Sequence, residues 1–304
     1  MCGICGEITF DGRDASAARI ERMTGCMARR GPDGAGMILR GRVGMGHRRL
    51  KIIDLSEAAA QPFTDTALGL TIAFNGCIYN YPELRRELEA KGHSFASTGD
   101  TEVILKAWKE WGPDAVPKLH GMFAFAIHDR ETGRVAFVRD RFGIKPLYLA
   151  ETPGRLAFAS TLPALLKAGE VDTSIDRVAL HHYMTWHAVV PAPRTILKGI
   201  RKLPAATIRV VEPDGTHHDT TYWEPDFERS AEDATRSGAE WAEMVLEALR
   251  VSVRRRMVAD VPVGVLLSGG VDSSLIVGLL AEEGQKNLAT YSIGFEAAHG
   301  ESGD

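Results

Sequence analysis

One stretch of this 304-residue chain limits its fold more than any other, because strand, loop and helix signals follow one another without a gap. Val263–Leu267 is a continuous apolar run, Ser268–Ser273 has the sequence Ser-Gly-Gly-Val-Asp-Ser, and Ser273–Glu282 has a helical pattern. A short apolar run of this kind predicts a buried strand of a parallel sheet. The two glycines let the backbone approach a ligand, and a helix N-terminus attracts an anion. The stretch therefore predicts the opening of a parallel α/β unit with a phosphate-binding loop.

The type of loop follows from its six residues. It is not a Walker loop, because no Gly-Lys-Ser or Gly-Lys-Thr follows the glycines. A plain glycine turn with Asp272 as helix N-cap is the remaining structural alternative. The stretch resembles the SGGxDS loop of ATP-pyrophosphatase enzymes, which cleave ATP between its α and β phosphates and activate a carboxylate as an acyl-adenylate. The resemblance implies that Asp272 holds magnesium and pyrophosphate. The positions that it implies for ATP binding are Leu267, Ser268, Gly269, Gly270, Asp272, Ser273 and Ile293.

Residues 1–225 have a different pattern, in which short strands and helices are separated by turn signals. Strand-like runs occur at Cys5–Phe10, Gly36–Leu39, Val43–His47, Leu70–Phe74, Gly121–His128, Arg134–Arg139 and Leu156–Ser160, and helical patterns at Ala17–Arg29, Tyr81–Lys91 and Asp100–Trp111. This mixture predicts an α+β domain. The polar residues 226–238 predict a linker, and an amphipathic helix at Glu240–Met257 opens a second domain, residues 239–304. Two domains also agree with the chain length.

Composition and charge exclude several function classes. The formal net charge of -4 argues against nucleic acid as the main partner, since duplex binding needs a basic surface. No apolar run approaches the roughly 18 residues that a membrane span needs, which argues against a membrane partner. No signal peptide is visible at the N-terminus, so we expect a cytoplasmic protein. A homodimer is allowed by the sequence, which gives no sign of the oligomeric state.

Cys2 and Cys5 at the start of the chain have three interpretations. A C-x-x-C redox pair would be followed by a helix, whereas a strand and turn follow here, and a zinc site would need a second such pair. Removal of Met1 would instead give Cys2 a free α-amine beside its thiol. Because that amine has a pKa of about 7.7–8.0 and a thiol a pKa of about 8.5, the amine can accept the thiol proton at neutral pH. Cys2 is thus a candidate N-terminal nucleophile, while Cys5 and Cys26 are expected to be small core residues.

Six further motifs turn this candidate into a family resemblance. They are RRGPDG (Arg29–Gly34), GHRRLKIIDL (Gly46–Leu55), FNGCIYNYPEL (Phe74–Leu84), TGDTEVIL (Thr98–Leu105), HGMFAFAIHD (His120–Asp129) and RDRFGIKPLY (Arg139–Tyr148). They resemble the class II glutamine amidotransferase domain, and their order before SGGVDSS resembles glutamine-dependent asparagine synthetase. The resemblance implies an α+β fold, a four-layer αββα glutaminase of the N-terminal-nucleophile type, followed by the start of a truncated ATP-pyrophosphatase synthetase domain.

Site roles follow from the same resemblance, position by position. It implies that Cys2 attacks the glutamine amide and that Asn75 and Gly76 form the oxyanion hole. It implies that Arg49 binds the substrate α-carboxylate, with Asn75 also in the glutamine site, and that Asp100 binds the α-ammonium group. The glutaminase step needs no cofactor, whereas the synthetase domain uses ATP, Mg²⁺ and a carboxylate acceptor.

The acceptor is the least defined part of this prediction. Cys77 stands where most asparagine synthetases have a glutamate, and FNGCIYN resembles the N-acetylglutaminylglutamine amidotransferase branch. Amidation of that acylated dipeptide is therefore the first interpretation, with conversion of aspartate to asparagine as the alternative. A stand-alone N-terminal-nucleophile hydrolase would have no need of SGGVDSS. The intact set of Cys2, Arg49, Asn75 and Asp100 argues against a non-catalytic binding protein. Only two strands of a parallel sheet are present, at Val263–Leu267 and near Ala289–Phe295. We therefore expect this chain to hydrolyse glutamine without forming the amide product, and residues after about Gly238 to be poorly packed.

Overall fold

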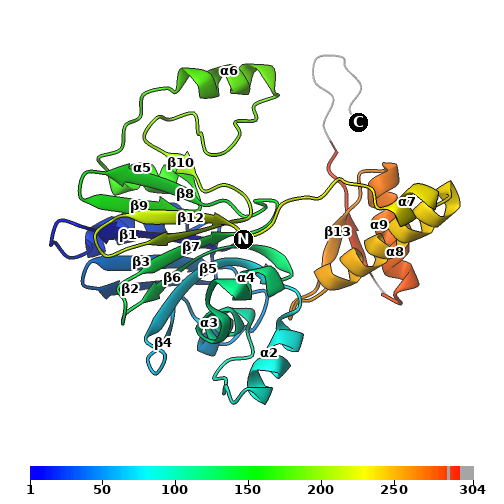
Figure 1. Ribbon diagram of the computed structural model, residues 1–304, viewed down its shortest axis with the longest axis horizontal. Coiled ribbons are helices and arrows are strands. Elements are labelled where there is room, and N and C mark those ends of the chain that lie inside the picture. Colours follow the sequence, from blue (N-terminus) through cyan, green and yellow to red (C-terminus); the bar gives the residue numbers. More distant parts are fainter. Residues whose placement is uncertain (286–287, 295–304) are drawn as a thin grey trace. The chain divides into compact units, whose positions relative to one another are not determined.

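The chain divides into two compact units, Met1–Pro225 and Asp226–Asp304, shown in Figure 1. The computed structural model describes residues 1–285 and 288–294. The division falls at the residue where the sequence predicts that the first domain ends. Within the described ranges, no helix has both the length and the apolar character needed to cross a membrane.

The first unit contains two six-stranded antiparallel sheets, here called sheet A and sheet B. Sheet A has the order β10-β8-β9-β1-β3-β2, and sheet B has the order β12-β11-β7-β6-β5-β4. The strands of sheet A are β10 (Arg201–Lys202), β8 (Tyr148–Thr152), β9 (Arg155–Ala159), β1 (Gly3–Thr9), β3 (Val43–Arg49) and β2 (Gly34–Arg40). The strands of sheet B are β12 (His217–Thr221), β11 (Thr207–Val211), β7 (Val135–Arg139), β6 (Gly121–Asp129), β5 (Leu70–Ile78) and β4 (Phe63–Asp65).

Helices cover the outer face of each sheet, which gives the layer order helix, sheet, sheet, helix. Helices α1 (Ala17–Cys26) and α5 (Leu162–Ala168) pack on sheet A. Helices α2 (Tyr81–Ala90), α3 (Asp100–Trp111) and α4 (Ala115–Lys118) pack on sheet B, below the sheets in Figure 1. Three buried apolar clusters fill the spaces between the layers. The predicted four-layer αββα fold is confirmed.

Side-chain alternation along β5 decides which residues face the other sheet. Ile72 and Phe74 belong to the cluster under the helices of sheet B, whereas Ala73 belongs to the cluster between the two sheets. Because strand side chains alternate between faces, Asn75 and Cys77 point the same way as Ala73. In the same way, Arg49 follows Val43 and Met45 on the inward face of β3.

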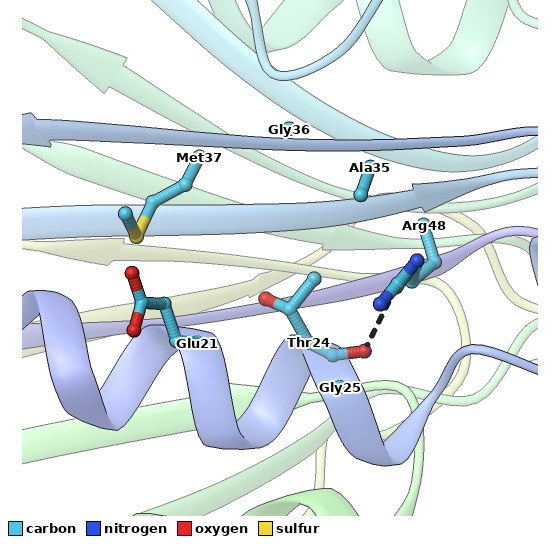
Figure 2. A pocket seen from close by; sticks show the side chains of 7 residues that line it. All are labelled: Glu21, Thr24, Gly25, Ala35, Gly36, Met37 and Arg48. Carbon is cyan, nitrogen blue, oxygen red and sulfur yellow. Dashed lines mark hydrogen bonds between the residues drawn. The ribbon is translucent and has the colours of Figure 1, made fainter.

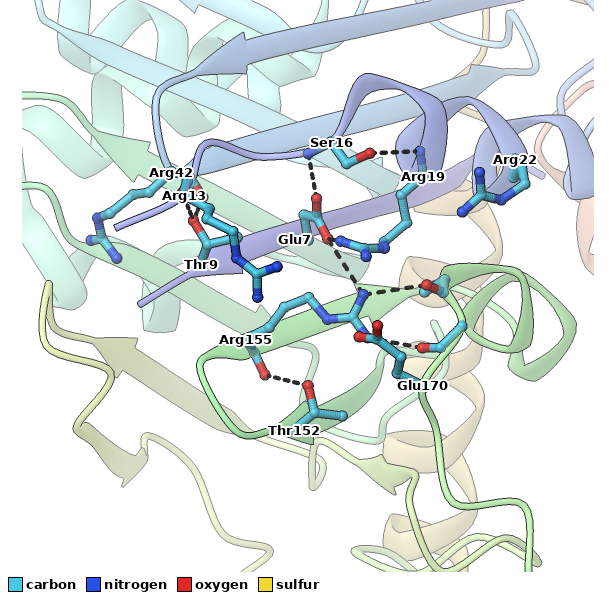
Figure 3. A network of polar contacts seen from close by, with 12 residues as sticks. Glu7, Thr9, Arg13, Ser16, Arg19, Arg22, Arg42, Thr152, Arg155 and Glu170 are labelled. Atoms are coloured by element: carbon cyan, nitrogen blue, oxygen red, sulfur yellow. Dashed lines mark hydrogen bonds and ion pairs between the residues drawn. The ribbon is translucent and has the colours of Figure 1, made fainter. Parts of the chain in front are cut away.

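A fully buried carboxylate ties sheet A to both of its helices, as Figure 3 shows. Glu7 on β1 accepts hydrogen bonds from the Ser16 backbone N–H (2.5 Å) and from Arg19 Nη1 on α1 (2.7 Å). It also lies 3.7 Å from Nη1 of Arg155 on β9. Arg155 in turn donates to the Ala168 carbonyl (3.3 Å) and the Gly169 carbonyl (2.8 Å) at the end of α5. One buried charge thus aligns the N-terminus of α1 and the C-terminus of α5.

Several elements differ from the sequence predictions. The strand predicted at Leu70–Phe74 continues to Ile78, and the helix predicted at Ala17–Arg29 ends at Cys26. Cys26 is exposed, so the expectation that it is a core residue is wrong, whereas Cys5 is buried as expected. The predicted linker contains a short helix, α7 (Ala231–Thr235), because Ser230 and Asp233 form a capping box at its start. Strands β4, β8, β10, β11 and β12 and helices α4, α5 and α6 (Arg177–Thr185) were not predicted.

The second unit contains the predicted parallel α/β element. Helix α8 (Gly238–Arg256) packs on α9 (Val271–Glu282), and β13 (Gly264–Leu266) pairs in parallel with β14 (Ala289–Tyr291). The expectation of a buried strand at Val263–Leu267 is wrong in the part of the chain described here, where Leu266 is 68% exposed. Among the described residues, the cluster around Val253, Leu279 and Leu280 covers one face of β13. The predicted strand at Ala289–Phe295 is shorter, and Phe295 lies outside the described residues.

Candidate active site

Cys2 lies directly before β1, the strand of sheet A that pairs with β3 on one side and β9 on the other. Its Sγ accepts a hydrogen bond from the Leu50 N–H (3.3 Å) and lies 3.6 Å from the Leu50 carbonyl. Arg30 Nε donates to the Cys2 carbonyl (3.0 Å), which fixes the backbone. Burial raises the pKa of the Cys2 thiol, and the Leu50 N–H and the chain terminus oppose this rise. The thiol is therefore held in place but needs a base to become a nucleophile.

The backbone of β5 presents an open edge next to this cysteine site. The Phe74 N–H donates to Gln61 Oε1 (2.7 Å), the Phe74 carbonyl accepts from His47 Nε2 (3.0 Å), and the Ile78 N–H donates to Asp100 Oδ2 (3.0 Å). These groups point away from β6, so Phe74, Gly76 and Ile78 are the residues that do not bond to that strand. The Gly76 N–H lies between two satisfied neighbours and points to the same open edge. We find no acceptor for it there among the described residues.

Asn75 supplies a second unused donor beside Gly76. It is 1% exposed, and its side-chain Nδ2 has no hydrogen-bond partner within the described ranges. A buried amide without a partner costs free energy, unless a ligand supplies an acceptor. A Cβ at Gly76 would lie 2.3 Å from the Met122 carbonyl, so no larger residue fits there. Two adjacent donors of this kind can stabilise an oxyanion.

Arg49 and Asp100 lie close enough to Cys2 for their charges to act on its thiol. Both are 6% exposed. Arg49 ends β3, and its terminal nitrogens donate to the Ser56 carbonyl (2.7 Å) and to the Asp54 carbonyl, which orients the guanidinium group. Burial raises the pKa of Asp100, the first residue of α3, to about 7, although the Ile78 N–H and the Arg49 charge oppose the rise. One cation and one titratable carboxyl therefore flank the thiol.

Cys77 and Lys145 also lie near the cysteine site. The sequence motifs connect Cys77 only with the identity of the acceptor, and they predict no role for Lys145. Burial and the Asp100 charge raise the pKa of Cys77 to about 12, so its buried thiol stays neutral. Lys145 is 4% exposed, and its Nζ lies 3.1 Å from Met1 Sδ. Lys145 belongs to the loop between β7 and β8, which lies within the RDRFGIKPLY motif. The sequence pattern around this lysine does not show whether its side chain is buried or exposed.

A separate cavity of about 370 Å³ lies between α1 and the strands β2 and β3, as Figure 2 shows. Its walls include Glu21, Met37 and Arg48, and Arg48 Nε donates to the Thr24 carbonyl (3.1 Å). None of the predicted site residues lines it. We therefore assign no role in the chemistry of Cys2 to this cavity.

In the second unit, the predicted ATP residues gather at the carboxyl edge of β13 and β14. The Leu267 N–H donates to the Tyr291 carbonyl (2.8 Å), and Ser292 Oγ donates to the Leu267 carbonyl (2.6 Å). Ile293 follows directly and is 74% exposed. The carboxyl edge of parallel strands is where ligands bind in open α/β sheets.

The glycine loop after β13 has an open backbone. Gly269 has a φ of 80°, which a side chain would disfavour, and a Cβ there would meet no atom within 4 Å. Ser268 and Ser273 hydroxyls lie 3.1 Å apart and brace the loop, while Asp272 is exposed in the first turn of α9. In the described residues no group of three or more metal-ligating side chains exists. A single carboxylate still fits Mg²⁺, which often binds through one carboxylate plus substrate phosphates.

The four-layer fold, with a cysteine directly before a central strand, is that of the N-terminal-nucleophile proteins. A family model described as a glutamine amidotransferase domain matches residues 1–223, and one described as asparagine synthase matches residues 244–304. The chain therefore belongs to the glutamine amidotransferase domain family.

Curated relatives agree with this family. The chain is 38% identical over 299 residues to asparagine synthetase [glutamine-hydrolyzing] 1 of Bacillus subtilis strain 168, covering 97% of this chain and 46% of the relative. It is 35% identical to putative asparagine synthetase [glutamine-hydrolyzing] 2 of Methanocaldococcus jannaschii, covering 99% of this chain and 61% of that protein. The chain thus spans about half the length of such relatives.

Among solved structures, glutamine phosphoribosylpyrophosphate amidotransferase from B. subtilis, complexed with ADP and GMP, matches with a TM-score of 0.53 and 17% identity. The match covers 98% of this chain and 67% of that one. At this identity the similarity concerns the fold alone.

Proposed function

We propose that the first unit, residues 1–225, hydrolyses the side-chain amide of glutamine with Cys2 as nucleophile. The observation that carries the proposal is the pair of unpartnered donors, Asn75 Nδ2 and the Gly76 N–H, on the part of β5 that faces the cysteine site. Once Met1 is removed, the Cys2 α-amine takes the Sγ proton and the thiolate attacks the amide carbon. The two donors stabilise the oxygen that becomes negative. The protonated α-amine gives this proton to the leaving nitrogen as the intermediate collapses, which releases ammonia. Water then hydrolyses the thioester to release glutamate and restore the thiol.

The charged residues beside the thiol supply the binding of the amino acid. Arg49 is already oriented by two carbonyls and suits the α-carboxylate, since a guanidinium group can bind both oxygens. Asp100 suits the α-ammonium group, and ionised Asp100 binds it better than the neutral acid does. Cys77 has no charge to offer here, so Asp100 is the one acidic residue that we assign to the substrate.

For the second unit, preceded by a linker at residues 226–238, we propose ATP-dependent activation of a carboxylate that then accepts the ammonia. The open loop Ser268–Ser273 at the carboxyl edge of the strands supports a phosphate site, with Leu267 and Ile293 beside the nucleotide. Asp272 would hold Mg²⁺, which when bound neutralises phosphate charge. The proposed acceptor is N-acetylglutaminylglutamine. Aspartate is the second candidate, because the relatives reported above are named asparagine synthetases. The proposed location of this enzyme is the cytoplasm.

Ammonia release by purified protein, with the mature N-terminus verified by intact mass, tests the glutaminase proposal. We expect release from glutamine without ATP, and loss of at least about a hundredfold in Cys2→Ala, since the thiol nucleophile is lost while the α-amine of residue 2 remains. A variant in which Met1 is retained should be inactive, because its Cys2 nitrogen is an amide. Cys26→Ala is the matched control, since this cysteine is exposed on α1. Full activity with Met1 attached would contradict the mechanism.

Pyrophosphate release separates the synthetase from a stand-alone hydrolase. The purified protein is incubated with glutamine, ATP and magnesium and with either aspartate or N-acetylglutaminylglutamine. Pyrophosphate that depends on the dipeptide supports the proposed acceptor, and pyrophosphate that depends on aspartate supports the alternative. Glutamate production with neither acceptor consumed would favour the hydrolase.

A further inference from the structure

Lys145 is a buried cation with an unusual environment. Its side chain is 4% exposed, and its Nζ donates to Met1 Sδ at 3.1 Å. A thioether is a weak acceptor, and no carboxylate lies within ion-pair distance of this ammonium group in the described ranges. Burying a charge without a partner is costly. A lysine kept in this position therefore calls for a functional explanation.

The structural role of this loop does not need the ammonium group. The Lys145 N–H donates to Asp140 Oδ2 (2.9 Å), and the Lys145 carbonyl accepts from Arg139 Nε (2.9 Å). Asp140 also accepts from the Ile144 N–H (2.8 Å), so the backbone holds the turn. The side chain is free to serve the neighbouring site.

The charge of Lys145 acts on the start of the chain. It contributes to lowering the pKa of the Met1 amine, after burial and together with Arg30, and it interacts with the Cys2 thiol. The titratable and charged groups that face this region are Cys2, Arg30, Asp33, Arg49, Cys77, Asp100, Asp140 and Lys145. Arg30 donates to the Cys2 carbonyl through Nε, while its Nη2 has no partner in the described ranges, and Asp140 is bonded to the loop backbone. Arg30 and Lys145 are thus both cations near the terminal residue, and Lys145 is the one whose charged end contacts the Met1 side chain.

Removal of Met1 changes this environment in a defined way. It takes away the sulfur that Lys145 contacts and creates a new α-amine at Cys2. Two like charges within about 4–6 Å disfavour each other, so a fixed ammonium group favours the neutral form of an amine beside it. The neutral form is the one that can accept the thiol proton.

We propose that Lys145 is a positioning residue for the Cys2 nucleophile: its buried ammonium group keeps the free α-amine of Cys2 neutral and ready to accept the thiol proton. The inference rests on the proposed glutaminase function. Lys145 contacts neither the amide nor the substrate in this role, because it acts through the amine. Met1 shields the ammonium group in the unprocessed chain, and processing exposes that group to the new amine.

The test compares Lys145→Met, Lys145→Arg and Lys118→Met as processed proteins, with the N-terminus checked by intact mass. Lys118 is the matched control, because it is an exposed lysine of the same unit that pairs with Glu87. The measurement is the pH dependence of kcat and KM for ammonia release. We expect the acidic limb of kcat to move up by about one pH unit in Lys145→Met. It should keep its position in Lys145→Arg and in Lys118→Met, and KM should change little.

An acidic limb at the wild-type position in Lys145→Met overturns the inference, as does a change confined to KM. If Lys145→Met does not fold, as judged by circular dichroism, Lys145→Gln is measured in its place with the same expectation. The pH dependence of iodoacetamide alkylation at Cys2 gives a readout without turnover and should shift in the same direction. If instead wild type and Cys2→Ala release ammonia equally, the glutaminase proposal itself fails, which is a distinguishable result.

Discussion

Asn75 and Gly76 show at the scale of single residues how a sheet core becomes a binding surface. Both belong to β5, and the two residues before them in this strand, Ala73 and Phe74, are ordinary buried residues. Asn75 places an unpaired amide on the inner face, and Gly76 keeps an N–H open at the strand edge. Because the Gly76 backbone lies against the Met122 carbonyl, any side chain would displace the strand. Stabilisation of the oxyanion thus depends on two adjacent positions: one must supply a side-chain amide, and the other must supply a backbone N–H and have no side chain.

Asp100 gives a pH prediction at the same scale. Its folded pKa is about 7, above the ordinary value of 3.8, because burial disfavours the charge. Below pH 7 the carboxyl is neutral and attracts the substrate ammonium group weakly, and above pH 7 it is ionised. We therefore expect KM for glutamine to fall as pH rises from about 6 to about 8, with the fall levelling off above the pKa.

Asp100→Asn is the variant that checks this assignment. It should raise KM at pH 8 by at least about tenfold, since a hydrogen bond to a charged partner is lost, and remove the pH dependence of KM. Asp114→Asn, a change at the start of α4 in the same unit, is the control. A pH-dependent KM that persists in Asp100→Asn would show that another group titrates.

At the scale of elements, the open edge of β5 results from unequal strand lengths. β4 pairs only with Leu70–Ile72, so the second half of β5 lacks a strand on that side. Side chains from other elements replace it: Gln61 and His47 bind Phe74, and Asp100 binds Ile78. Burial lowers the pKa of His47 to about 4, so its ring is neutral and can hold the carbonyl without adding charge. The unpaired stretch leaves room for a ligand at Gly76.

The Glu7 network gives a stability prediction for the helices on sheet A. Glu7→Gln leaves Arg19 and Arg155 without a buried anionic partner, and we expect the free energy of unfolding of the first unit to fall by about 3 kcal/mol. Glu151→Gln is the control, because its side chain is 52% exposed and pairs with Arg209, so a change below about 1 kcal/mol is expected. Urea unfolding followed by tryptophan fluorescence measures both. Equal losses in the two variants would argue against the network as a link between β1, α1 and α5.

At the scale of the whole molecule, the two units differ in how much apolar surface they bury. The first has three buried clusters, whereas the second has one, with Val253, Leu279 and Leu280 as its buried members among the described residues. Val271 is 84% exposed and Leu266 is 68% exposed, although both belong to the α/β element. Loose packing after Gly238 was expected because two paired strands cover little of each other's faces.

Limited trypsin digestion of a polypeptide with these 304 residues tests this difference. Because local opening is easier where little surface is buried, we expect cleavage first after Arg229 or Arg236 and then within α8. The remaining fragment should keep its ammonia release and its thermal transition. Early cleavage within residues 1–225, or loss of ammonia release together with the second unit, would contradict the independence of the first unit.

The family, the α+β class, the SGGVDSS loop and most strands of the first unit could be predicted from the sequence, since these depend on local patterns and motifs. It did not predict β11 and β12, whose residues are only partly apolar, and it made Cys26 a core residue although the helix face at that position is open. That the Gly76 N–H and Asn75 Nδ2 lack partners among the described residues is visible only in the folded chain, because it depends on where β4 ends and on side chains from distant segments. The contact between Lys145 and Met1 likewise cannot be predicted from a local pattern. The two residues are 144 positions apart in sequence, and the packing of the two sheets brings them together.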